Sequence, residues 1–340
     1  MAKKIRLGVV NWDAGLPKDT YFGGYMINFL GNPEHARRLP YFAKEDENGN
    51  YYIPERTQAD YDEELQMAAD AGIDFFMYCW YPDGGEEPEV GHEDLGFLVE
   101  HLPYLNTARK LYQQSPLNQK INMCAILIGL HAYSQKDIAR LVDAMGQDYY
   151  EKKGGRPLVF IFGGYLPELM RQVREAANQA GLDPYVIFIN NGKNSEDGDY
   201  SQADAVAAYA AFSEADNFED FCADVRKDNE RRKAYGIPVI PIHSAGWNPR
   251  PRVDRACPWC SYADTSYAPA PTADQMEQAT LDYFRWIEEN GDCANTGYGT
   301  IFAWNEFEEG GYICPTLGAD GKPYTAVLDG LAKAIKKYDQ

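Results

Sequence analysis

The sequence of 340 residues predicts a single (β/α)₈ barrel, with extended loops after its strands, that spans residues 1–340 as one domain. Two observations predict it: short apolar runs recur along the chain, and helical patterns with recognisable ends lie between most of them. The runs are continuous and do not alternate between apolar and polar residues, as expected of parallel strands covered on both faces. No linker-like tract rich in Pro, Ser and Gly divides the chain, which favours one barrel over two domains.

The predicted strands are runs of β-branched and aromatic residues, with Ala205–Tyr209 the weakest. In order they are Ile5–Val10, Ile73–Cys79, Ile121–Ile128, Leu158–Phe162, Tyr185–Ile189, Ala205–Tyr209, Pro238–Ile242 and Tyr298–Trp304. A doubly wound sheet is the competing fold, but it usually has a Gly-rich phosphate loop after an early strand. The turn at residues 11–15 reads Asn-Trp-Asp-Ala-Gly and matches neither phosphate-binding pattern, so the barrel is preferred.

Four predicted helices have start and stop signals. They begin at Thr57, at Ser134, near Leu169 and at Thr272, and they end near Gly72, Gly146, Gly181 and Gly291. Thr57 and Thr272 have an Asp and a Gln three positions later, which is typical of a capping box. The stretches 14–56 and 243–271 are rich in Gly, Pro, Tyr and charge, and are predicted to be long loops at a binding face.

The charge balance argues against several classes of partner. With 52 acidic and 32 basic residues the net charge is −20, which repels nucleic acid and anionic membranes, and no apolar stretch is long enough to cross a bilayer. No obligate protein partner is indicated. The first ten residues lack the apolar core of a signal peptide, so the chain as written is expected in the cytoplasm, or outside it if a leader has been removed.

Residues at the carboxyl ends of the strands form the active site of such a barrel. The candidates for substrate binding at these positions are Trp12, Asp13, Trp80, Tyr81, His131, Asn190, His243, Trp247, Asn248, Trp304 and Asn305. Aromatic rings stack on sugar rings and also fill cores, whereas Asn, His and Asp hydrogen-bond hydroxyl groups. Together they indicate a carbohydrate ligand.

Three carboxylates, Glu306, Glu308 and Glu309, follow the last predicted strand at once. The plain interpretation is solvated charge at the start of a helix. Cleavage of a glycosidic bond, however, needs one protonated carboxyl and one ionised carboxylate in different environments. Glu306 and Glu309 are three residues apart and would face one pocket if the chain turns helically, so they are the candidate catalytic pair.

Trp304–Gly310 resembles the W-N-E-[WF]-x-E-G segment of glycoside hydrolase family 99 and its WbsX-type relatives from bacterial polysaccharide loci. Further segments match the WbsX-type pattern in order, namely Ala68–Tyr81, Gly155–Phe162, Ser244–Arg252 and Tyr312–Leu317. The resemblance covers most of the chain. It implies a (β/α)₈ barrel.

The resemblance to family 99 also implies a retaining endo-α-mannosidase that acts through a 1,2-anhydro sugar, without a metal or an organic cofactor. Glu306 matches the base that takes the proton of the 2-hydroxyl group, and Glu309 matches the acid that protonates the leaving oxygen and later activates water. Phe307, Glu308 and Asn248 depart from the family pattern. These departures leave the identity of the sugar open.

Two other functions stay open at this point. A glycosyltransferase of a polysaccharide locus would need a phosphate-binding loop, for which Arg250, Arg252 and Arg255 are the candidates. A non-catalytic carbohydrate-binding barrel is the other, and the presence of both glutamates counts against it. Cys257 and Cys260 form a lone C-x-x-C in a Pro- and Arg-rich loop, without the further ligands that a zinc site needs, and their role is left open.

Overall fold

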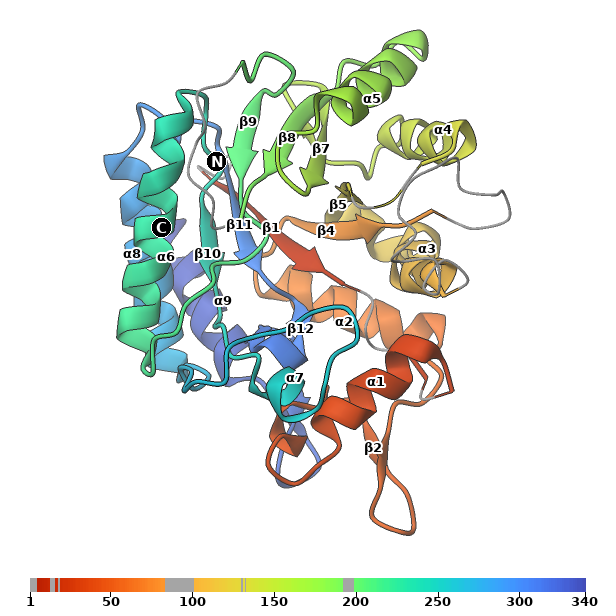
Figure 1. Ribbon diagram of the computed structural model, residues 1–340, viewed down its shortest axis with the longest axis vertical. Helices are drawn as coiled ribbons and strands as arrows, with labels where there is room; N and C mark the ends of the chain where they lie inside the picture. Colours follow the sequence, from red (N-terminus) through yellow and green to blue (C-terminus); the bar gives the residue numbers. More distant parts are fainter. Residues whose placement is uncertain are drawn as a thin grey trace.

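The computed structural model describes residues 5–12, 16–17, 19–82, 101–129, 131, 133–191 and 199–340. The parallel strands in this part of the chain are β1 (Arg6–Asn11), β4 (Phe75–Trp80), β5 (Asn122–Ile128), β7 (Arg156–Phe162), β8 (Tyr185–Ile189), β9 (Ala205–Ala207), β10 (Ile242–Ser244) and β11 (Tyr298–Phe302). They lie side by side in the order β10-β11-β1-β4-β5-β7-β8-β9, and helices surround them (Figure 1). The predicted (β/α)₈ barrel is confirmed.

An isolated parallel bridge between Val206 and Val239 joins β9 to the segment before β10 and so closes the ring. The Val206 amide donates to the Pro238 carbonyl, and the Ile240 amide donates to the Val206 carbonyl, both at 2.9 Å. The run Pro238–Ile242 was predicted as the whole strand, but β10 begins only at Ile242. Two prolines interrupt regular pairing here, at 238 and 241, because proline has no amide hydrogen to donate.

The helices are α1 (Tyr21–Leu30), α2 (Gln58–Asp70), α3 (Thr107–Gln114), α4 (Gln135–Met145), α5 (Pro167–Gln179), α6 (Phe218–Arg232), α7 (Arg250–Asp254), α8 (Ala273–Glu289) and α9 (Ala326–Tyr338). Short 3₁₀ turns are η1 (Ala36–Arg38), η3 (Leu102–Asn106), η4 (Pro116–Gln119), η5 (Lys233–Tyr235) and η6 (Phe307–Glu309). Two-residue strands are β2 (Lys44–Glu45), β3 (Tyr51–Tyr52), β6 (Lys152–Lys153), β12 (Asn305–Glu306), β13 (Gly311–Tyr312), β14 (Thr316–Leu317) and β15 (Pro323–Tyr324). Within the described residues, no helix is long and apolar enough to cross a membrane.

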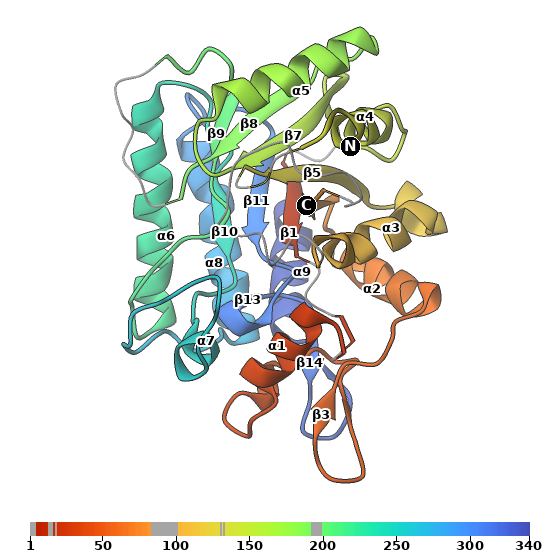
Figure 2. The same ribbon diagram turned by 45° about the vertical axis from the view of Figure 1, so that its right-hand side comes forward.

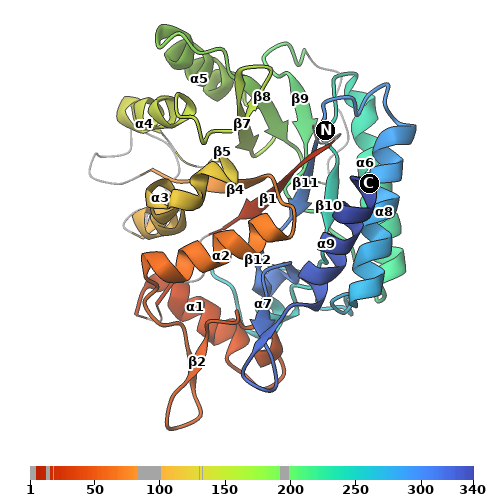
Figure 3. The same ribbon diagram turned by 180° about the vertical axis from the view of Figure 1, so that it is seen from behind.

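The predicted helix starts are confirmed at Thr57, Ser134 and Thr272, each of which forms a complete capping box. The stretch 14–56 differs from the predicted loop because it contains α1. Thr20 caps this helix by accepting from the Gly23 amide, and its apolar face is buried. The stretch 243–271 likewise contains the short α7. Figures 2 and 3 show α1 and α7 close together beneath the carboxyl ends of β1 and β11.

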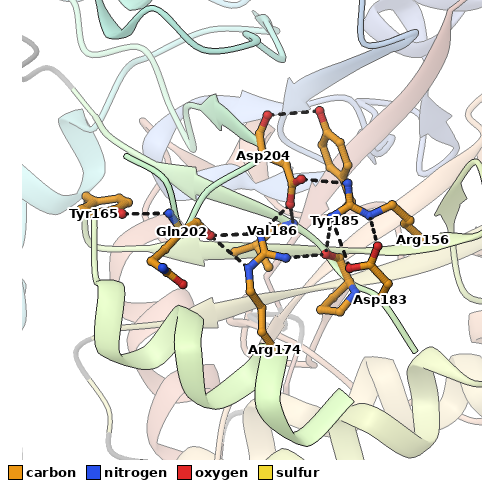
Figure 4. Close-up of polar contacts among 9 residues, drawn as sticks. Arg156, Tyr165, Arg174, Asp183, Tyr185, Val186, Gln202 and Asp204 are labelled. Carbon is orange, nitrogen blue, oxygen red and sulfur yellow. Dashed lines mark hydrogen bonds and ion pairs between the residues drawn. The ribbon is translucent and has the colours of Figure 1, made fainter. Parts of the chain in front are cut away.

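A polar network connects the amino ends of β7, β8 and β9, at the end of the barrel opposite the carboxyl ends of its strands (Figure 4). Asp204 accepts hydrogen bonds from Arg156 at 2.8 Å, from Arg174 at 2.6 Å and from the Val186 amide at 2.8 Å. Burial alone would raise the pKa of Asp204, but these donors hold that pKa below its ordinary value. The network therefore stabilises the fold only while Asp204 is ionised.

Substitution Asp204→Asn is expected to lower the free energy of unfolding by about 2 kcal/mol at pH 7, because charge-assisted hydrogen bonds are lost. Since the pKa of Asp204 is lowered on folding, its contribution is full above its ordinary value of 3.8 and is lost as the pH falls through the folded pKa. Urea unfolding should show the difference at pH 7 and little of it near pH 2. Asp183→Asn is the matched control, because Asp183 also contacts Arg156 but its side chain is 67% exposed; an equal loss there would contradict the assignment.

Candidate active site

The three carboxylates lie together at the carboxyl end of β11. Glu306 ends β12, and Glu308 and Glu309 belong to η6, after which Gly310 takes a left-handed conformation with φ of 75° and turns the chain into β13. All three are buried, with 4%, 1% and 7% of their surfaces exposed. They are therefore not the solvated charges of an ordinary helix start.

Arg252 of α7 contacts all three carboxylates, and its side chain is only 4% exposed. Its Nη2 lies 3.3 Å from Glu308 Oε1 and 3.8 Å from Glu306 Oε2, and its Nη1 donates to Glu309 Oε1. A guanidinium has donors on several edges, so one side chain can serve several carboxylates. Its single positive charge cannot balance three negative ones.

Burial strongly raises the pKa of Glu306, and the charge of Glu309 adds to this, while Arg252 and a hydrogen bond from Tyr209 oppose it. The Tyr209 hydroxyl donates to Glu306 Oε1 at 2.6 Å. Among the described residues, nothing hydrogen-bonds Glu306 Oε2. Burial also raises the pKa of Glu308, with Arg252 opposing. At neutral pH the group thus holds less negative charge than three free glutamates.

Glu309 has a different set of neighbours. The Tyr262 hydroxyl donates to Glu309 Oε1 at 2.5 Å, so that this oxygen receives both Tyr262 and Arg252. Burial and the charge of Glu309 raise the pKa of Tyr262 far above its ordinary value, and the phenol remains a donor. Among the described residues, the side-chain donors to Glu309 thus contact its Oε1 and not its Oε2.

The loops after β10 and β11 are joined backbone to backbone. The Asn248 amide donates to the Glu309 carbonyl at 2.6 Å. A Cβ atom at Gly246 would lie 2.6 Å from the Gly310 carbonyl oxygen, and one at Gly310 would lie 2.8 Å from the Asn248 nitrogen. Only glycine fits this approach at both positions. It positions α7, and with it Arg252, against the carboxylates.

Several of the predicted binding residues lie around this cluster. The Trp12 indole donates to the Tyr81 hydroxyl at 2.9 Å, and the Trp12 amide donates to Asn305 Oδ1 at 2.9 Å. The Trp12 ring also faces the Arg252 guanidinium, with 5.7 Å between the guanidinium carbon and the ring centroid. Next to Tyr81 lies His131, with ring centroids 5.6 Å apart.

Two further predicted residues border the cluster on its other side. Trp247 packs edge-on against Tyr262, with centroids 5.5 Å apart. The Asn248 side chain donates to the Ala268 carbonyl at 2.9 Å, so it braces the loop while its backbone binds Glu309. Asp13 lies outside the described residues.

Trp80 and Trp304 are not brought to the carboxylates. Trp80 lies beneath the Arg109 guanidinium of α3 at 3.9 Å, and the Trp304 indole donates to Glu64 of α2 at 2.9 Å. Both rings therefore fill the layer between the barrel and its helices. Trp80 is the last residue of β4 and Trp304 follows the end of β11, and both side chains face outward.

His243 and Asn190 also lie apart from the cluster. The His243 ring hydrogen-bonds Thr280 of α8 at 3.0 Å, and burial lowers its pKa to about 4, so the ring is neutral at pH 7. The Asn190 side chain donates to the Tyr235 hydroxyl in η5. Neither side chain approaches the three glutamates, and a role for them in substrate binding is not supported by their placement.

Sequence reasoning did not assign Tyr209, Tyr262 and Arg252 to the site. Tyr209 ends a predicted strand, and active-site residues of a barrel lie at the carboxyl ends of strands, so the sequence already indicated this position. Arg252 ends the segment Ser244–Arg252, where it was considered only as a phosphate ligand. For Tyr262 the sequence carries no signal, because its place depends on how the loop after α7 folds.

The described residues contain one grouping of three possible metal ligands, Glu34, His35 and Asp254. Within it His35 is already bound to Asp254, at 2.7 Å. The three buried glutamates are contacted instead by Arg252.

No family model and no curated protein matches the chain. Solved structures do match it, and two of them match over almost their whole length. A GH99 endo-α-mannosidase from Bacteroides thetaiotaomicron in complex with Bis-Tris propane is 16% identical, with a TM-score of 0.58, and the match covers 99% of this chain and 98% of that one. A second structure of the GH99 endo-α-mannosidase from that organism is 13% identical, with a TM-score of 0.55 and the same coverage. The chain therefore has a GH99-like fold.

Proposed function

We propose that this chain is a glycoside hydrolase, one catalytic domain over residues 1–340, that cleaves α-linked, mannose-like bonds in a polysaccharide or oligosaccharide with retention of configuration. The observation that carries the proposal is a pair of buried glutamates at the carboxyl end of the barrel, Glu306 and Glu309, held by different donors around one arginine. The fold shared with GH99 endo-α-mannosidases and the motif Trp304–Gly310 support the same reaction.

In the first step Glu306 acts as the base. Its Oε2 takes the proton of the sugar 2-hydroxyl group, and the resulting oxygen attacks C1 to form a 1,2-anhydro sugar. The bond from C1 to the leaving oxygen breaks, and Glu309 protonates that oxygen. Burial raises the pKa of Glu306, so its carboxylate is a stronger base than a solvated glutamate once the proton is lost.

In the second step Glu309, now ionised, takes a proton from water, and the hydroxyl attacks C1. The anhydro ring opens, and the proton on Glu306 returns to the 2-oxygen. Both residues regain their first protonation states. Each step inverts C1, so the product retains the configuration of the substrate.

Tyrosine hydroxyl groups orient both glutamates. Oε1 of each glutamate is held by a tyrosine, Tyr209 or Tyr262, which leaves the other oxygen for the sugar. Arg252 limits repulsion between the two and keeps them in place. The buried rings of Trp12 and Trp247 pack against Arg252 and Tyr262, and so hold these two donors beside the pair.

The test is digestion of a panel of α-mannans, α-glucans and bacterial surface polysaccharides, with product sizing and NMR of the newly released anomer. We expect cleavage of at least one α-linked glycan to a product that first appears as the α-anomer. A β-anomer would contradict retention. Tight binding of a nucleotide sugar without hydrolysis would favour a transferase, and glycan binding without cleavage would favour a binding barrel.

Substitution Tyr209→Phe is expected to raise the pKa of Glu306 further, because the hydrogen bond that lowers it is lost. The base is then protonated over a wider range, so the acidic limb of the kcat/KM profile moves to higher pH. On that limb we expect kcat/KM to fall by about tenfold, which is the effect of losing one hydrogen bond to a charged group. Tyr324→Phe, at an exposed tyrosine, should leave the profile unchanged. An unshifted limb in Tyr209→Phe would refute the role of Glu306 as the titrating base.

A further inference from the structure

Cys257 and Cys260 lie in contact in the loop that follows α7. Their sulfur atoms are 2.8 Å apart, both thiols are free, and both residues are partly exposed. Pro258 and Trp259 separate them along the chain. A pair at this distance and with this access can be oxidised without a large movement of the backbone.

The cysteine pair is connected to the carboxylate cluster in two ways. Cys260 Sγ lies 3.7 Å from Arg252 Nη1, the nitrogen that donates to Glu309. Tyr262, two residues after Cys260, donates to Glu309 at 2.5 Å. A chemical change at Cys260 therefore acts directly on both donors of Glu309.

Trp259, between the two cysteines, anchors the loop to α1. Its ring packs against Phe22 at 5.6 Å and Tyr25 at 5.2 Å between centroids. The same ring lies 5.9 Å from the Arg252 guanidinium. The loop is thus held at both sides, and the sulfur atoms stay together beside Arg252.

The two thiols differ in reactivity. The hydrogen bond with Cys257 and the charge of Arg252 lower the pKa of Cys260 to about 7, against the effect of burial, and the same hydrogen bond raises the pKa of Cys257. Tyr262 and Glu309 are the other titratable groups that face Cys260. The pKa values of the remaining cysteines are raised, at Cys79, Cys124, Cys222, Cys293 and Cys314. Cys260 is thus the more readily ionised thiol, and Cys257 is the resolving thiol beside it.

We propose that Cys257 and Cys260 form a reversible disulfide, made by exchange with a low-molecular-weight disulfide, that regulates the carboxylate site through Arg252. The Cys260 thiolate attacks one sulfur of glutathione disulfide, forms a mixed disulfide and releases one glutathione thiolate. Cys257 then loses its proton and attacks the Cys260 sulfur, which releases the second glutathione. Two electrons pass from the cysteine pair to glutathione disulfide, and two glutathione thiols result.

The regulatory effect rests on the proposed function. In the disulfide, Cys260 no longer offers Arg252 a negative sulfur, so the guanidinium charge falls on the glutamates alone. The contact between Arg252 and Glu309, the residue proposed to protonate the leaving oxygen, changes with it. We expect the oxidised enzyme to be about fivefold slower in kcat on an unactivated glycan, a small part of the about 10²–10⁴-fold that a positioned acid contributes, and to recover fully with dithiothreitol.

The chemical test does not depend on activity. The full chain is equilibrated in glutathione buffers of graded ratio, quenched with an alkylating reagent and mapped by mass spectrometry. In oxidising buffer we expect the peptide that contains both Cys257 and Cys260 to be 2 Da lighter than the reduced peptide and to be unalkylated. In reducing buffer both cysteines should be alkylated. Cys222→Ser, at another partly exposed cysteine, should titrate like the wild type.

Two results would overturn the proposal: alkylation of both cysteines at every glutathione ratio, or a stable mixed disulfide that Cys257 never resolves. Cys257→Ser should stop at that mixed disulfide, which gives a mass gain of one glutathione. If the disulfide forms but the kcat of the oxidised and reduced enzymes is equal, the regulatory part fails. If no glycan is cleaved in either state, the proposed function fails while the disulfide stands.

Discussion

Glu309→Gln is expected to lower turnover of an unactivated glycan by about 10²–10⁴-fold, the range that a positioned acid contributes. With an aryl glycoside whose leaving group needs no proton, most of the first-step rate should return. Glu306→Gln removes the base that activates the 2-hydroxyl group, so it should lose activity on both substrates. The measurement is kcat/KM of each variant on the two kinds of substrate.

Glu308→Gln is the matched control. Glu308 is as buried as its neighbours and binds the same arginine, but it has no role in the proposed steps. We expect a much smaller loss of activity from it. Wild-type turnover in both Glu306→Gln and Glu309→Gln would refute the hydrolase mechanism, and rescue of Glu306→Gln by the activated substrate would reverse the two roles.

The second large effect is expected from Arg252→Leu, which should lower the free energy of unfolding by about 3–5 kcal/mol near pH 8 and abolish activity. The reason is that three buried carboxylates lose the cation they share. Arg252→Lys keeps a positive charge but loses the planar guanidinium with its several N–H donors. This variant should therefore be more stable than Arg252→Leu and remain nearly inactive.

The loss of stability should depend on pH. Because folding raises the pKa of Glu306 and Glu308, their contribution is full below their ordinary value of 4.5 and is lost as the pH rises through the folded values. Without Arg252 those values rise further. The difference between Arg252→Leu and the wild type should thus shrink from pH 8 toward pH 4.5, as measured by urea unfolding.

Arg171→Leu is the control for this experiment, because Arg171 forms only exposed ion pairs with Glu168 and Glu175. Pairs of this kind contribute little, so no large or pH-dependent loss should appear. A loss in Arg252→Leu that is the same at pH 4.5 and pH 8 would contradict the electrostatic explanation and indicate lost packing instead.

The barrel was predictable because its signals are local: apolar runs and capping residues such as Ser134 lie next to one another in the sequence. The helix α1 was missed because Gly23 and Gly24 disfavour a helix, and its stability comes from burying Phe22 and Phe29 against the rest of the protein. That contribution is tertiary.

The site was predictable only as far as strand ends can indicate it. Selecting residues at the carboxyl ends of predicted strands found Glu306, Trp12 and Tyr81. The same selection included Trp80 and Trp304, whose side chains face the helices. A parallel strand buried on both sides has no alternation of apolar and polar residues, so the sequence does not tell which side chains face inward. The positions of Arg252 and Tyr262 depend on the folded loop itself.

The glycine contact between the loops after β10 and β11 has a consequence for how such an enzyme could be redesigned. Because Gly246 and Gly310 leave no room for any side chain, the two loops fit only each other. They would have to be transferred into another barrel together. The segment that carries α1 meets these loops through side chains, with Trp259 packed against Phe22 and Tyr25. New sugar preferences are therefore more readily introduced in α1 than in either of the loops that carry the chemistry.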